Sequence, residues 1–163
     1  MKVRMILATL AAFSLAAAAG AAKISGTIQC GKADPAHMVE VSDEPGHSMG
    51  VSKVNCTWPK PLEIAGLKSK DGVSIATDDT KGGKSAGHGT HVSTMDNGDK
   101  FYCKFQGNGM VKDGAMQSDA GTWSFTGGTG KLKGIKGKGT YNGKGTPDGG
   151  VTYEVKGDYT LAK

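Results

Sequence analysis

Strict alternation of apolar and polar side chains in the last segment of the chain limits the possible folds most. Positions 151, 153, 155, 159 and 161 carry Val, Tyr, Val, Tyr and Leu. The even-numbered positions between them, 152 to 160, are all polar or charged. A period of two places one face of a β-strand in a core and the other in water. The segment therefore predicts an antiparallel sheet with one buried face.

Shorter alternating runs recur along the chain between turn residues such as Asp-Gly and Asn-Gly, which supply the positive φ that tight hairpins need. Turns are expected at 43–46, 70–72, 96–98, 106–109, 112–114 and 147–150. The strands are expected at 24–30, 38–42, 49–58, 72–77, 88–95, 100–106, 121–126, 131–142 and 151–161. A meander of this length closes on itself or folds into a sandwich. We therefore predict an all-β fold, a single closed or nearly closed antiparallel β-barrel of about eight strands.

The register of the last hairpin follows from its buried faces. Tyr141 belongs to the apolar face of the preceding strand, and a two-residue loop would pair it with Lys156 and bury that lysine. A loop of odd length instead sets Tyr141 against Val155. Leu132 and Ile135 are out of phase, so Gly134 is expected to be a bulge or corner that switches faces.

The N-terminus reads as a secretory signal peptide over residues 1–22. A short positive segment precedes an apolar run from 5 to 19, and small residues follow it, with cleavage expected near Ala21 or Ala22. The run is too short for a stable membrane span. We expect a mature domain over 23–163 that is exported to the periplasm or the extracellular space, with no stable membrane span.

Three cysteines in an exported chain predict one disulfide and one remaining thiol. Cys103 lies between Phe101 and Phe105 on an apolar face, which is typical of a buried thiol that behaves as a small hydrophobe. We therefore expect the disulfide between Cys30 and Cys56. Pairing through Cys103 stays open, because spacing alone does not set connectivity.

The charge of the chain is +5, and removing Lys2 and Arg4 with the signal peptide leaves +3. Arg4 is the only arginine, and lysine lacks the bidentate fork that suits phosphate and guanine. The composition therefore disfavours nucleic acid as a partner. The lysines at 131, 133, 136, 138 and 144 are expected to form a solvated outer wall opposite Glu154 and Asp158.

Catalytic and cofactor motifs are missing from the sequence. It contains no nucleophile elbow and no complete dinucleotide fingerprint, and it lacks the spacing of a calcium loop. Asp78 and Asp79 lie in a polar, glycine-rich stretch, 77–87, that is expected to be an exposed loop. We therefore predict no catalytic residue and no cofactor.

The histidines are candidates for a metal site. His88 and His91 have the H-x-x-H spacing, and His47 with Met49 adds nitrogen and thioether donors of the kind that suits copper. In a strand, however, His88 and His91 point to opposite faces, so they chelate together only if the flanking glycines form a turn. The alternative is that these are polar histidines near hairpin ends.

The aromatic residues point to a function in the barrel interior. A barrel of about eight strands is either filled by its side chains or holds one small ligand. Inward glycines remove volume and so favour a cavity, whereas core packing is the alternative. The candidate lumen residues are Trp58, Phe101, Cys103, Phe105, Trp123, Phe125, Tyr141 and Tyr153.

The segment 125–141, Phe-Thr-Gly-Gly-Thr-Gly-Lys-Leu-Lys-Gly-Ile-Lys-Gly-Lys-Gly-Thr-Tyr, resembles the F-x-G-G-T-G-[KR] segment of allene-oxide-cyclase-like and dirigent-like β-barrels. It looks closest to small exported bacterial proteins of that superfamily. The resemblance implies a calycin-like barrel of eight strands that holds a small hydrophobic molecule. None of the polar lumen residues of the plant enzymes matches a position here.

Three functions follow as hypotheses. The leading one is a non-catalytic binding module for a small apolar or amphipathic ligand in the barrel lumen. The first alternative is an isomerase or cyclase of the allene-oxide-cyclase type, which needs a convergent polar set in the lumen. The second is a cell-envelope protein that acts through its lysine wall or a metal-binding loop. Nothing in the sequence assigns an oligomeric state.

Overall fold

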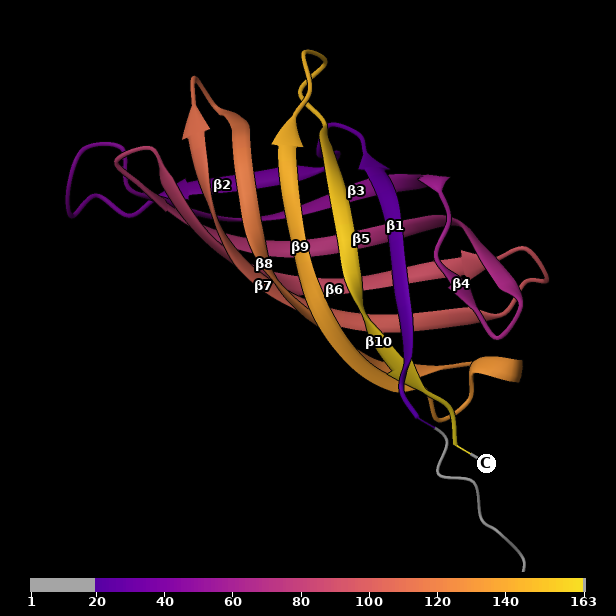
Figure 1. Cartoon of the computed structure of the whole chain (residues 1–163). Helices are drawn as coiled ribbons and strands as arrows, with labels where there is room; N and C mark the ends of the chain where they lie inside the picture. The colour runs from indigo at the N-terminus through magenta and orange to yellow at the C-terminus, as the bar shows by residue number, and fades with distance from the viewer. Residues whose placement is uncertain (1–19, 163) are drawn as a thin grey trace, which may run out of the picture.

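The computed structural model describes residues 20–162, and most of the predicted signal peptide lies outside them. The described residues form ten strands and one short 3-10 helix (Figure 1). Their bounds are β1 Ala22–Cys30, β2 Ala36–Glu40, β3 Ser48–Lys60, β4 Glu63–Ile64, β5 Leu67–Lys81, β6 Lys84–Met95, β7 Lys100–Lys112, β8 Ala115–Gly128, η1 Gly130–Leu132, β9 Lys136–Gly145 and β10 Val151–Thr160.

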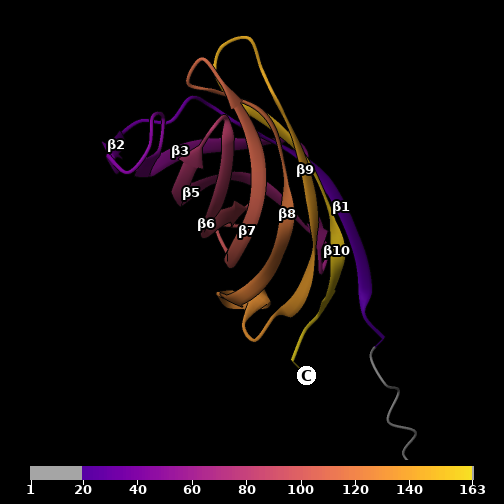
Figure 2. The same ribbon diagram turned by 90° about the vertical axis from the view of Figure 1, so that its left-hand side faces the viewer.

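Eight antiparallel strands close into a barrel, which confirms the predicted architecture. The order around the ring is β3-β1-β10-β9-β8-β7-β6-β5, and the pairing of β3 with β5 closes it. The short strands β2 and β4 are added beside β3 and β5. In Figure 1, β1, β8, β9 and β10 run nearly vertically in front of β3, β5 and β6, which run across behind them, and Figure 2 shows the front strands arching around the interior.

The last hairpin has the predicted register. Its loop has five residues, 146–150, and it sets Tyr141 opposite Val155 and Lys138 opposite Asp158. Both Tyr141 and Val155 are buried, whereas Lys138 is exposed. The odd loop length therefore keeps the apolar faces of β9 and β10 together.

One predicted loop and two predicted turns belong to strands in the structure. Strands β5 and β6 continue through most of the stretch 77–87 and turn at Gly82 and Gly83, both of which have positive φ. The 70–72 turn lies within β5 at a register irregularity, and the 106–109 turn lies within β7. These segments looked like loops because their inward side chains are polar or missing, so the alternation carries no apolar signal.

The strand predicted at 131–142 begins only at Lys136, because a 3-10 turn precedes it. The Ile135 N–H donates a hydrogen bond of 3.1 Å to the Leu132 carbonyl, so the chain turns between these two residues. Leu132 and Ile135 are both buried, without a face-switching bulge inside the strand. Gly134 forms the corner, and its φ of 75° is one that glycine adopts without strain.

The cysteines have the expected arrangement. Cys30 and Cys56 are opposite each other on β1 and β3 and form the disulfide, and Cys103 is a buried free thiol. Burial raises the pKa of the Cys103 thiol well above its usual range, so it stays protonated and unreactive. The disulfide is compatible with an exported protein. Among residues 20–162, no helix is long and apolar enough to cross a membrane.

Candidate functional site

The inward side chains divide the barrel interior into an aromatic end and a polar end. At the aromatic end, Phe101 is almost fully buried and meets Trp58 and Phe125 edge-on, while Trp123 meets Phe125 with a ring-centre distance of 4.9 Å. These contacts make a packed core. Space for a ligand is therefore expected at the other end.

A row of three glycines crosses the barrel wall at the polar end. Gly87, Gly107 and Gly121 are neighbours on β6, β7 and β8, with Asp78 of β5 at one end of the row and Tyr141 of β9 at the other. A side chain at Gly121 would lie 2.5 Å from the Tyr141 hydroxyl, and one at Gly87 would lie 2.5 Å from the Asp78 carboxylate. The glycines therefore let Tyr141 and Asp78 extend toward each other over the wall.

The next row toward the hairpins carries the second carboxylate. Asp119 of β8 has Gly109 and Gly143 as its cross-strand neighbours, and Tyr153 of β10 follows beyond Gly143. A side chain at Gly143 would run into the Tyr153 ring, so this ring lies over the glycine and toward Asp119. The Tyr141 and Tyr153 rings meet edge-on with centres 5.6 Å apart. Asp119 is thus enclosed by two tyrosines.

Hydroxyl groups continue this row beyond Asp119. Ser85 lies opposite Gly109 and is buried, and Thr80 donates a hydrogen bond of 3.2 Å to its Oγ. The Ser85 hydroxyl in turn donates a bond of 3.5 Å to Asp78 Oδ1. The polar end is defined here as six residues on the inward faces of β5, β6, β8, β9 and β10, namely Asp78, Thr80, Ser85, Asp119, Tyr141 and Tyr153.

The charged forms of the two carboxylates, Asp78 and Asp119, are disfavoured by their surroundings. Burial, with the nearby charge of Asp78, raises the pKa of Asp119 to about 6, and the Tyr153 and Tyr141 hydroxyls partly offset this rise by hydrogen bonding. Burial also raises the pKa of Asp78. The pKa values of both tyrosines are raised, first by burial and then by Asp119. No lysine forms an ion pair with Asp78 or Asp119 within residues 20–162.

An open concavity of about 1330 Å³ lies along the outer face of the strands that carry the polar end. Ser85, Gly109, Asp119 and Gly143 belong to its lining, but most of the lining residues alternate with the inward residues of their strands and face outward. Asn142 and Lys144 of β9 contribute further polar groups. The concavity therefore lies outside the barrel wall, and Asp119, which is partly exposed, belongs to its lining.

The histidine motif is split between the two faces of β6. His88 is exposed, whereas His91 is buried against Trp58 and shares a hydrogen bond of 2.8 Å between its Nδ1 and Ser74 Oγ. Burial lowers the pKa of His91 to about 4, so its ring is neutral, and its Nε2 has no hydrogen-bond partner among residues 20–162. The structure therefore does not bring His88 and His91 together as a chelating pair.

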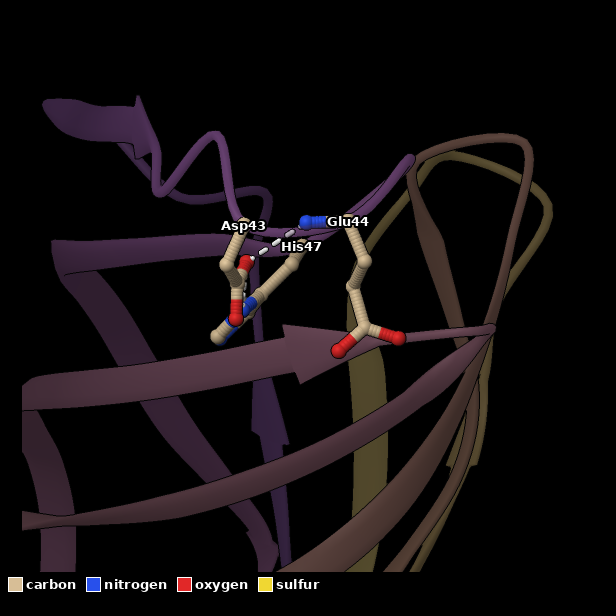
Figure 3. A group of neighbouring side chains, drawn as sticks. All are labelled: Asp43, Glu44 and His47. Atoms are coloured by element: carbon tan, nitrogen blue, oxygen red, sulfur yellow. Dashed lines mark hydrogen bonds and ion pairs between the residues drawn. The ribbon is translucent and has the colours of Figure 1, made fainter.

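Another histidine, His47, joins two carboxylates outside the barrel. Its Nδ1 lies 2.6 Å from Asp43 Oδ1 and its Nε2 lies 3.0 Å from Asp79 Oδ1, while Glu44 of the same loop pairs with Lys81 (Figure 3 shows Asp43, Glu44 and His47). Hydrogen bonding to Asp43 raises the pKa of His47. Because both ring nitrogens already face carboxylates, this cluster is best described as an ionic clasp that holds the 41–47 loop on β5.

The predicted lumen residues all belong to the interior. Trp58, Phe101, Cys103, Trp123 and Phe125 are buried in the aromatic end, whereas Phe105, Tyr141 and Tyr153 lie nearer the polar end. Sequence reasoning missed Asp78, Ser85 and Asp119. The signal that could have found Asp119 is its odd position in β8, which places it on the same inward face as Trp123 and Phe125.

Comparisons with known proteins support the fold. No family model matches the chain, and no curated protein matches it. A solved structure of a protein of unknown function from the DUF3224 family of Shewanella oneidensis MR-1 is similar, with a TM-score of 0.50, 15% identity, and coverage of 88% of this chain and 99% of that one. Pyocyanin demethylase is also similar, with a TM-score of 0.43, 18% identity, and coverage of 82% and 98%. The first likeness supports the barrel fold alone, and the resemblance to allene-oxide-cyclase-like barrels is not confirmed.

Proposed function

We propose that the barrel binds a small amphipathic molecule at its polar end. The observation that supports this most is the position of Asp119, a half-buried carboxylate on the inward face of β8 between two tyrosines. A carboxylate with raised pKa and no lysine partner is costly to bury, and such groups cluster at functional sites. A ligand that neutralises it would recover that cost.

The chemistry of the polar end favours a ligand with a cationic or N–H donor group beside an apolar ring. Carboxylates bind such donors through charge-assisted hydrogen bonds. The faces of Tyr141 and Tyr153 attract a cation and also pack against apolar atoms. The apolar part of the ligand would then contact Phe105, whose ring meets Tyr141 edge-on with a centre distance of 6.4 Å.

A binding experiment with dansylcadaverine, a fluorescent aromatic amine, tests this proposal. We expect the protein to bind it, and Asp119→Asn to weaken binding by about tenfold or more at pH 8, because a charge-assisted hydrogen bond is lost. Asp113→Asn is the matched control, since Asp113 is exposed in the turn between β7 and β8. Equal affinity of all three proteins would refute the proposal, as would a failure of the wild type to bind.

Native mass spectrometry of the protein purified from its own source then identifies the natural ligand. A co-purified amine or other N–H donor molecule that is absent from the Asp119→Asn protein supports the site. A natural ligand that both proteins retain equally, or an acidic molecule, contradicts the proposed recognition.

A second candidate function is proton transfer on the bound molecule, as in an isomerase or cyclase. It is favoured by one observation, the pKa of Asp119 at about 6, because a general acid or base works best with a pKa near the operating pH. Incubation of the co-purified ligand with protein in D₂O tests it. Deuterium incorporation that depends on Asp119 supports catalysis, whereas none supports a binding module.

A further inference from the structure

A second surface, on the outside of the barrel, has a different chemistry. An open groove of about 1060 Å³ crosses strands β1, β10, β9, β8 and β7. Four lysines line it, and Asp158 is the single acidic residue among the lining residues. The lysines are Lys23, Lys104, Lys138 and Lys156. Only Lys138 belongs to the lysine cluster that the sequence suggested, since the others come from separate strands.

Strand register places three of these lysines in one line. Lys23 of β1 is opposite Asp158 of β10, which is opposite Lys138 of β9. Lys138 is opposite Ser124 of β8, and Ser124 is opposite Lys104 of β7. Lysines therefore stand on every second strand, and with strands about 4.8 Å apart the Cα positions repeat about every 10 Å.

The cationic character of this line is only partly compensated. Asp158 forms an ion pair of 3.4 Å with Lys23, and both groups are open to solvent. Exposed pairs of this kind hold their partners weakly. Lys104, Lys138 and Lys156 have no acidic partner in the groove, so it carries a net charge of +3 and attracts anions.

The neutral side chains between the lysines are hydrogen-bonding groups. Ser25, Gln106, Thr122, Ser124 and Thr140 contribute hydroxyls and an amide on the same face. The two aromatic residues of the lining, Phe105 and Trp123, pack into the barrel core, so neither offers its ring for base stacking within the groove. The groove therefore pairs widely spaced positive charges with groups that bind sugar hydroxyls.

We propose that this groove binds an anionic polysaccharide, a sugar chain that carries carboxylate or sulfate groups. Its charges are sparser than those of nucleic acid, which in the DNA duplex carries one charge about every 1.7 Å, and they suit the spacing of the lysines. Nucleic acid would also use aromatic platforms or arginine forks, which the groove lacks. The proposal does not depend on ligand binding inside the barrel.

The test measures binding of the mature protein to polygalacturonate and to dextran sulfate, with uncharged dextran as the negative control. We expect both charged polymers to bind at low salt and uncharged dextran not to bind. The variant Lys23→Gln, Lys104→Gln, Lys138→Gln, Lys156→Gln should bind about tenfold or more weakly, and the slope of log affinity against log salt should fall by about three. The two polymers distinguish the carboxylate from the sulfate form of the ligand.

A charge-matched control separates the groove from net charge. Replacing four exposed lysines outside the groove, Lys53, Lys70, Lys112 and Lys133, by glutamine removes the same charge. This control should lose less than about threefold in affinity, since its contribution acts only through screened long-range attraction. Far-UV circular dichroism and thermal unfolding verify that both variants are folded.

Several results would overturn the proposal. Equal losses in the two lysine variants would mean that binding follows net charge alone. Failure of the folded wild-type protein to bind either charged polymer would remove the ligand class. Tighter binding to single-stranded DNA or to vesicles with anionic lipid, and loss of that binding in the groove variant, would assign the surface to a different partner.

Discussion

Replacing Asp119 by asparagine is expected to stabilise the barrel at pH 8 and to leave it nearly unchanged at pH 4. The ordinary pKa of this carboxyl is 3.8, and in the folded barrel it rises to about 6. The folded state therefore holds the proton more tightly than the unfolded state. Stability falls as pH rises from about 4 to above 6, because the charge that develops is costly to bury.

The magnitude follows from the difference between the two pKa values. Each pKa unit corresponds to about 1.36 kcal/mol, so the rise from 3.8 to about 6 sets an upper limit of about 3 kcal/mol. Asp119 is only partly buried, and solvent screens its charge. We therefore expect Asp119→Asn to add about 1–2 kcal/mol to the free energy of unfolding at pH 8.

Urea denaturation at pH 4, 6 and 8, followed by the fluorescence of Trp58 and Trp123, measures the effect. The wild-type protein should lose stability across this range, and Asp119→Asn should lose less. Asp113→Asn carries the same charge change on an exposed turn and should keep the wild-type pH dependence. If Asp119→Asn is less stable than the wild type at pH 8, or keeps the full pH dependence, the assignment of Asp119 as a strained interior carboxylate is wrong.

Three further predictions concern the wall, the disulfide and the outer loop. Gly121→Ala should destabilise the protein by about 1–3 kcal/mol in urea denaturation, because its Cβ would lie 2.6 Å from Cζ of Tyr141; an unchanged midpoint would contradict the close approach. The double variant Cys30→Ser, Cys56→Ser should lose about 2–4 kcal/mol, since the bridge closes a loop with a sequence separation of 26; no loss in thermal unfolding would argue against a structural disulfide. The pKa of His47 is raised above 6.5, so its clasp is fully formed below that pH and weakens as pH rises through the higher folded value. After correction for intrinsic exchange rates, the amides of residues 41–47 should be more protected at pH 6 than at pH 9 in the wild type. The His47→Ala variant should show no such difference. Equal protection of the wild-type amides at both pH values would rule the clasp out.

Local pattern predicted the parts of the barrel whose inward side chains are large and apolar. The register of the β9–β10 hairpin was predicted correctly, because pairing the apolar faces of Tyr141 and Val155 excludes an even loop, which would bury a lysine. The bridge of Cys30 and Cys56 was the favoured pairing, because Cys103 lies on an apolar face, although the sequence left pairing through Cys103 open. In both cases, a side chain that must be buried shows which face of its strand points into the core.

Prediction failed where the inward positions are glycine, serine or aspartate. The segment 77–87 and the glycines of β7 read as loops, although they form the wall of the polar end. Inward glycines leave no alternation to detect, and an inward aspartate looks like a surface residue. These positions are locally inconsistent with a buried strand, as functional sites often are.

The sequence by itself determined that this chain forms an antiparallel barrel, and which face is buried in the strands whose inward side chains are large and apolar. These properties depend on side chains one or two positions apart, so local order is sufficient. Only the tertiary structure decided that Asp78, Asp119, Tyr141 and Tyr153 meet at one end, and that lysines from four strands line one outer groove. Such meetings depend on the register of strands that are distant in the sequence, and closure of the ring sets that register.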